Sequence, residues 1–179
     1  MRRYLVIALI IIAAAGAFYW YGRSRDPAAS NAQPTPMRDY KDATYEIEGA
    51  PVTLVNGVAE RDAAPGSASK IVTTYFGNEA KGDLSGDGLP DIAFLLTQSG
   101  GGSGTFYYVV VALQAADGGY AGTNAVLLGD RIAPQTTEIS NGTLTVNYAD
   151  RKPDEPMTAQ PSQGVSRYLR MDNGRLIGK

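Results

Sequence analysis

Two short, almost continuously apolar runs, residues 92–98 and 106–113, restrict the fold of this chain more than any other feature. Continuous apolar character over so few residues is typical of strands that are covered on both faces. A glycine-rich segment, residues 99–105, joins the two runs. We therefore predict that they pair with each other at the centre of a sheet.

Turn chemistry predicts further antiparallel strands. The pair Asn-Gly favours a type I′ turn because both central residues of that turn need positive φ, and the pair begins at positions 56, 141 and 173. The expected hairpin arms are residues 52–55 with 58–61, 136–140 with 143–148, and 165–171 with 175–177. Residues 44–48 and 70–76 add β-branched and aromatic runs. The predicted fold is mainly β, an antiparallel sandwich or partly open barrel of about seven to nine strands built from hairpins.

One N-terminal transmembrane helix is expected before the β fold. Residues 4–21 are uncharged and mostly apolar, and Arg2 and Arg3 precede them. A helix of that length spans about 27 Å, close to the ~30 Å hydrocarbon core of a bilayer. We therefore predict a membrane anchor at residues 1–22, retained as a signal-anchor. The alternative is a cleaved signal peptide, because Ala15-Gly16-Ala17 fits a cleavage pattern.

The anchor is followed by a tether and then by the β domain. Residues 23–41 are rich in Pro, Ala and Ser and have no apolar period, so we expect a disordered tether. Residues 42–179 form the predicted β domain. Four of the 16 basic residues lie at positions 2, 3, 23 and 25. Residues 26–179 therefore carry 12 basic and 18 acidic side chains, a formal charge of −6. An acidic domain without a basic stripe argues against nucleic acid as a partner.

Residues 83–91 have the pattern of a calcium-binding loop. Oxygen-bearing side chains occupy relative positions 1, 3, 5 and 9, and the glycines at 86 and 88 allow the tight coil that such a loop needs. The expected ligands of one Ca²⁺ are the side chains of Asp83, Ser85, Asp87 and Asp91 and the backbone carbonyl of Leu89, with water completing the shell. The simpler alternative is that Asp and Gly cluster here because they form good turns.

This loop, followed directly by the apolar run at 92–96, resembles the calcium loops of FG-GAP and VCBS repeats and, more distantly, those of EF-hands. Ser85 stands where those repeats more often have Asn or Asp, and Phe94 stands where an EF-hand requires a bidentate Glu. A propeller needs about four to eight blades, and the chain has one such loop. The chain as a whole resembles a group of bacterial envelope proteins. We expect a single-pass protein of the bacterial inner membrane with its domain facing the periplasm or the cell exterior, because a short basic start and a large acidic domain favour the N-terminus inside and the domain outside.

The chain has no histidine and no cysteine. These absences exclude Ser-His-Asp and Cys-His catalysis, thiolate metal sites and ordinary zinc centres. Tyr107, Tyr108, Tyr120 and Tyr148 could line a ligand groove or could pack within the sheet. No set of residues predicts a catalytic site. Whether the chain is an enzyme stays open, and we favour the interpretation that it is not.

The predicted function is a membrane-tethered, extracytoplasmic, calcium-stabilised β domain that acts as a binding or structural module of the bacterial envelope. Its expected partners are the membrane, through the N-terminal helix, and an envelope protein or glycan. The alternative is a carboxylate-dependent hydrolase of cell-wall or glycan substrates, since many acidic residues are available for a catalytic pair.

Overall fold

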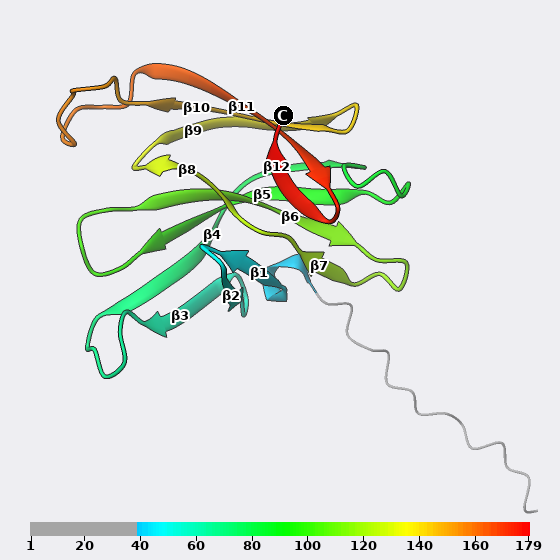
Figure 1. The fold of residues 1–179 in the computed structure, drawn as a ribbon, viewed down its shortest axis with the longest axis horizontal. Helices are drawn as coiled ribbons and strands as arrows, with labels where there is room; N and C mark the ends of the chain where they lie inside the picture. The colour runs from blue at the N-terminus through cyan, green and yellow to red at the C-terminus, as the bar shows by residue number, and fades with distance from the viewer. Residues whose placement is uncertain (1–38) are drawn as a thin grey trace, which may run out of the picture. The chain divides into compact units, whose positions relative to one another are not determined.

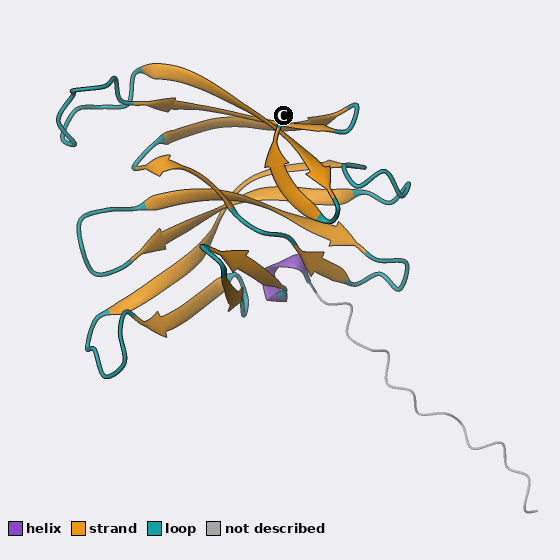
Figure 2. Cartoon of the chain, viewed as in Figure 1, coloured by secondary structure: helices purple, strands orange, loops and turns teal. Residues whose placement is uncertain are grey.

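The computed structural model describes residues 39–179, and the predicted mainly β fold is confirmed there (Figure 2). A short 3₁₀ helix, η1 (Tyr40–Asp42), precedes the strands. The strands are β1 (Thr44–Ile47), β2 (Ala50–Thr53), β3 (Val58–Asp62), β4 (Lys70–Gly82), β5 (Asp91–Ser99), β6 (Phe106–Gln114), β7 (Tyr120–Gly122), β8 (Val126–Asp130), β9 (Ala133–Ser140), β10 (Thr143–Asp150), β11 (Gln163–Asp172) and β12 (Arg175–Gly178). These twelve strands exceed the predicted seven to nine. The predicted anchor, residues 1–22, lies outside the described residues, and no helix within 39–179 has the length and apolar character to cross a membrane.

The strands form three antiparallel sheets. A four-stranded sheet has the order β12-β11-β10-β9, and a six-stranded sheet has the order β3-β4-β5-β6-β7 with β8 also paired to β6. The hairpin of β1 and β2 forms a small sheet of its own. Figure 1 shows the six-stranded sheet between the other two. The four-stranded and six-stranded sheets therefore pack face to face, as the layers of a sandwich do.

The central position predicted for the two apolar runs is confirmed, because β5 and β6 pair at the middle of the six-stranded sheet. Successive side chains point to opposite faces of a strand. Leu95 of β5 therefore packs in a core with Leu144, Leu169 and Leu176 of the four-stranded sheet. Its neighbour Phe94 packs in a second core with residues of β1 and β2, namely Tyr45, Ile47 and Val52. Both faces of β5 are covered, as its composition predicted.

Two of the three predicted hairpins are confirmed and one is wrong. Asn141 and Asn173, each with φ near +50°, form the turns between β9 and β10 and between β11 and β12. At Asn56-Gly57, by contrast, β2 pairs with β1 and β3 pairs with β4, and only one bridge joins Val55 to Val58. The reason is that the backbone N–H of Asn56 donates to the Asp42 carboxylate and the backbone N–H of Gly57 donates to the Lys41 carbonyl. This turn therefore carries the chain from one sheet to another.

The folded domain begins slightly earlier than the predicted boundary at residue 42. Tyr40, assigned to the tether, lies in η1 with its ring 5.5 Å from that of Phe94 and 5.8 Å from that of Tyr120. Its hydroxyl donates to Glu79 at 2.6 Å. Burial, together with the hydrogen bond to Glu79, raises the pKa of Tyr40 above its ordinary value. The start of the domain is thus fixed in an aromatic cluster.

Asn124, between β7 and β8, joins the two large sheets. Its side-chain amide donates to the Leu176 carbonyl at 2.9 Å and accepts from the Leu176 N–H at 2.8 Å. The Asn124 amide thereby satisfies the backbone N–H and C=O of Leu176 on β12, which is an edge strand of the four-stranded sheet. An ion pair between Arg175 and Glu46, at 2.9 Å, connects the same strand to β1.

We expect Asn124→Ala to lower the free energy of unfolding by about 1–3 kcal/mol, because it leaves a donor and an acceptor of Leu176 without partners. The matched control is Asn147→Ala. Asn147 also makes two side-chain hydrogen bonds, but to Thr136 and Ser166 on the solvent face of the four-stranded sheet, and the expected loss is below about 0.5 kcal/mol. Urea denaturation of both variants measures the difference. Equal losses would show that Asn124 does not link the sheets energetically.

Candidate metal loop and binding face

The predicted calcium loop connects the end of β4 at Gly82 to the start of β5 at Asp91. Gly86 and Gly88 both have φ of +84°, which favours glycine and permits the coil. The Asp83 carboxylate accepts from the Gly86 N–H at 2.7 Å and from the Gly88 N–H at 3.0 Å. Asp87 accepts from the Leu89 N–H at 2.8 Å. Backbone amides thus hold the loop around its own carboxylates.

Asp91 is held differently from the other loop carboxylates. It is fully buried, whereas Asp83, Ser85 and Asp87 are exposed. Its Oδ2 accepts from the Leu84 N–H at 3.0 Å and from the Ser85 N–H at 2.8 Å, and its Oδ1 accepts from the Gln114 N–H at 3.1 Å. The carboxylate therefore faces protein donors on both oxygens.

The donor set fits a calcium ion in part. Each carboxylate oxygen can accept about two hydrogen bonds, so Asp83 and Asp87 keep capacity for a cation on the solvent side, where the Ser85 hydroxyl also lies. Asp91 has both lone pairs of Oδ2 in use. Within the described part of the chain, no three acidic side chains come close enough together to hold a metal ion. The five-residue ligand set stays a prediction, and the three exposed residues carry its chemistry best.

A second feature lies on the face of the six-stranded sheet that packs against the four-stranded one. Val58, Thr74, Thr97 and Tyr107 lie opposite one another across β3, β4, β5 and β6. The ring of Phe76 lies edge-on to that of Tyr107, with centroids 5.2 Å apart. Phe76 is 45% exposed and Val58 is 39% exposed, whereas Thr74, Thr97 and Tyr107 are half-buried, so this part of the face is covered only in part. We call these five residues the aromatic shelf.

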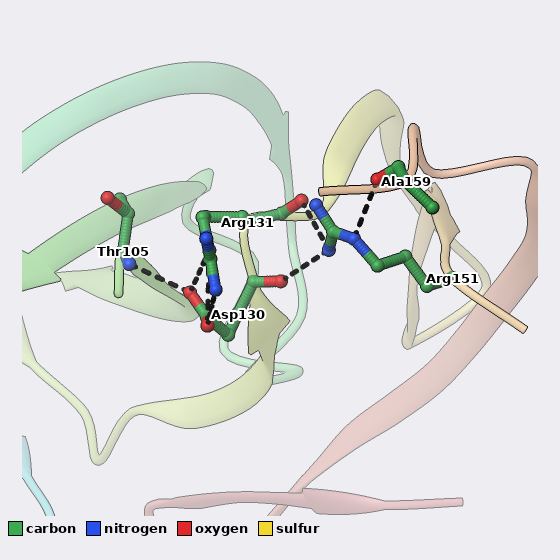
Figure 3. A network of polar contacts seen from close by, with 5 residues as sticks. All are labelled: Thr105, Asp130, Arg131, Arg151 and Ala159. Carbon is green, nitrogen blue, oxygen red and sulfur yellow. Dashed lines mark hydrogen bonds and ion pairs between the residues drawn. The ribbon is translucent and has the colours of Figure 1, made fainter. Parts of the chain in front are cut away.

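Three loops meet at Asp130 and Arg131, as Figure 3 shows. The Asp130 carboxylate pairs with Arg131 at 3.0 Å and accepts from the Thr105 N–H at 2.8 Å. Arg151 donates to the carbonyls of Asp130 and Arg131, each at 3.1 Å, and to that of Ala159 at 2.8 Å. This loop junction ties together the glycine-rich loop, the β8–β9 turn and the loop after β10. It adjoins the shelf because Tyr107 pairs with Gly129 in the sheet.

The electrostatics of the loop junction centre on Asp130. Partial burial of its carboxylate disfavours the charged form, but hydrogen bonds from Arg131 and Thr105 outweigh burial and lower its pKa below the ordinary value of 3.8. Sequence analysis missed Asp130, Arg131 and Arg151, because no local pattern marks residues that meet only after the sheets have formed.

The four tyrosines considered as groove residues separate into different roles. Tyr108 and Tyr148 are buried, and their hydroxyls donate to Glu48 at 2.8 Å and to the Leu128 carbonyl at 3.1 Å. Tyr120 packs against Tyr40 in the aromatic cluster. Of the four, Tyr107 is the residue that belongs to the aromatic shelf.

Two hollows on the described surface lie apart from the aromatic shelf. One, of about 110 Å³, is lined by residues of β2, β3 and β4 and has Glu60 as its one acidic side chain. The other, of about 470 Å³, is open, and Asp42 is its one acidic side chain. Hydrolysis by two carboxylates needs a pair that flanks the substrate. Neither hollow offers such a pair.

We expect the free energy of unfolding of Asp130→Asn to fall less steeply than that of the wild type as the pH is lowered. A carboxylate whose pKa is lowered by folding stabilises the protein fully above its unfolded pKa, and this contribution disappears as the pH falls through the folded pKa. The window therefore lies below about pH 4, since the ordinary pKa is 3.8. Urea midpoints measured from pH 5 to pH 2 test this expectation. Parallel curves for the wild type and the variant would contradict it.

Comparison with known proteins gave no match to a protein family, to a curated protein or to a solved structure. The likeness of residues 83–91 to FG-GAP and VCBS loops therefore remains a resemblance between short motifs. Evidence for the function comes from the aromatic shelf, the loop junction and the metal loop.

Proposed function

We propose that this chain is a binding module of the bacterial envelope, anchored by its N-terminal segment and stabilised by one weakly bound calcium ion. The aromatic shelf is the ligand surface, and the ligand is an envelope glycan. The observation that carries this proposal is the shelf itself, a sheet face that continues from the core to the exposed side chains of Phe76 and Val58.

The chemistry of the aromatic shelf supports a sugar. A sugar ring presents an apolar C–H face and a rim of hydroxyl groups. Phe76 and Tyr107 supply ring surface for the apolar face of the sugar. Thr74 and Thr97 supply hydroxyls for its polar rim, and they lie on paired strands, which are spaced about 4.8 Å apart in a sheet. The shelf contains no charged side chain, which favours an uncharged polyhydroxylated ligand over a phosphate or a nucleic acid.

The setting of the aromatic shelf also supports a polymeric ligand. The shelf runs across four strands and is exposed at Val58 and Phe76, so more than one unit of a chain could lie along it. The loop junction begins next to the Tyr107–Gly129 pair, where one ion pair and several hydrogen bonds to backbone carbonyls hold the neighbouring loops together. A domain tethered beside the membrane would meet the polymers of the cell envelope first.

The calcium ion in this proposal has a structural role. Asp83, Ser85, Asp87 and the carbonyl of Leu89 would hold it, and bound calcium would neutralise the exposed carboxylates of the loop. Few carboxylates and no bidentate Glu resemble the extracellular class of sites, with dissociation constants of about 10⁻⁴ to 10⁻³ M.

Phe76→Ser tests the ligand surface. We expect it to weaken binding to insoluble cell-wall polysaccharide about tenfold or more, because a central aromatic contact is commonly worth 1–2 kcal/mol or more. Phe106→Ser is the matched control, since Phe106 is also a strand residue, is 41% exposed and lies on the opposite face of β6 from Tyr107. Co-sedimentation of the folded variants measures binding. Equal binding by the two variants, or none by the wild type, would count against the shelf.

Chelation tests the calcium ion. With calcium at ten times its dissociation constant, we expect a gain of about 1.4 kcal/mol in the free energy of unfolding over the protein in EDTA. Asp87→Ala should remove most of this gain and change the chelated protein little, because its carboxylate is exposed. Thermal melts in EDTA and in millimolar calcium make the comparison. Identical wild-type midpoints would contradict the calcium proposal.

A further inference from the structure

Asp91 is a fully buried carboxylate whose three hydrogen bonds, in the described structure, all come from backbone N–H groups. Burial of a charge is costly unless hydrogen bonds compensate for it, and a carboxylate that accepts two or three backbone N–H bonds is well compensated. Contacts of 2.8 to 3.1 Å are of full strength. The spacing of Asp91 in the loop resembles that of a calcium ligand, but its surroundings are those of an internal anion.

We infer that Asp91 organises the metal loop without an ion, as a positioning residue and not as a ligand. Its Oδ2 gathers the N–H groups of Leu84 and Ser85, which are the second and third residues of the loop, and so fixes the backbone around the exposed oxygens. Any calcium affinity then belongs to Asp83, Ser85 and Asp87 on the solvent side. This inference refines the proposed calcium site but does not depend on calcium binding.

The packing of Leu84 supports this role. The Leu84 side chain is buried in the core between the two large sheets, together with Leu95 and Val111. Its N–H meanwhile donates to Asp91, so one residue is held by its side chain and by its backbone. The loop is therefore attached to the core at its beginning as well as at its end.

Asp91 also connects the metal loop to a neighbouring turn. Its Oδ1 accepts from the N–H of Gln114, the last residue of β6, which pairs with Tyr120 of β7. The carboxylate thus links the loop before β5 to the turn between β6 and β7. A change at Asp91 is expected to reach both segments, whereas a change at Asp87 is expected to stay within the loop.

Asp91→Asn and Asp87→Asn, each in EDTA and in millimolar calcium, test the inference. Asn replaces one acceptor oxygen with an N–H donor, which would oppose the backbone donors around Asp91. We expect Asp91→Asn to raise the unfolding equilibrium constant about tenfold to a hundredfold in EDTA, where no ion is present, and by at least that factor in calcium. Asp87→Asn should change it only when calcium is present. A loss by Asp91→Asn that occurs only with calcium would overturn the inference and make Asp91 a ligand.

Hydrogen exchange of the wild-type domain gives a second test that does not depend on the variant folding. In EDTA, the amides of Leu84, Ser85 and Gln114 should exchange at least about a hundredfold more slowly than in an unstructured peptide, and calcium should not slow them further. Fast exchange in EDTA that calcium suppresses would overturn the inference. If calcium leaves wild-type stability unchanged while these amides stay protected, the calcium proposal fails and the role of Asp91 stands.

Discussion

Burial of β5 and β6 on both faces is the constraint on which the rest of the structure depends. A strand with apolar side chains on both faces needs two covers, and the chain provides the four-stranded sheet for one face and the β1–β2 hairpin for the other. Each fully buried apolar side chain stabilises the fold by about 1.5–3 kcal/mol, so neither cover can be lost without a large cost. Asn124 and the Glu46–Arg175 pair join elements from different layers.

The aromatic shelf follows from an unequal extent of these layers. Tyr107 packs at the border of the core between the large sheets, and Val58 and Phe76 of the same shelf are exposed. The alternation of side chains that builds the core continues along the strands beyond the covered region. Apolar and hydroxyl groups at the surface are therefore fixed in position by the sheet. The loop junction lies one residue pair further along β6, where Asp130 pairs with Phe106. A sheet can in this way present apolar and hydroxyl groups at its surface without a deep pocket.

The sequence predicted what depends on neighbours along the chain. The apolar runs revealed the central strands, and Asn141 and Asn173 revealed their turns through the need for positive φ. The partners of β2 were mispredicted at Asn56, because contacts with Lys41 and Asp42 decide them. The sequence pattern of residues 83–91 predicted Asp91 as a calcium ligand. Spacing alone cannot show whether its carboxylate faces an ion or backbone N–H groups. The short strands β7 and β8 were missed because they are brief and depend on β6 for pairing.

Glu46 and Arg175 are 129 residues apart in the sequence. The first and last hairpins of the domain can therefore meet only after nearly all of the domain has been synthesised. Leu176, in the same final strand, completes the core between the large sheets. Such distant contacts make folding slow, and they deny a growing chain its finished core until the last strand has emerged. Until β12 pairs with β11, the core between the large sheets lacks Leu176 and stays open on that side.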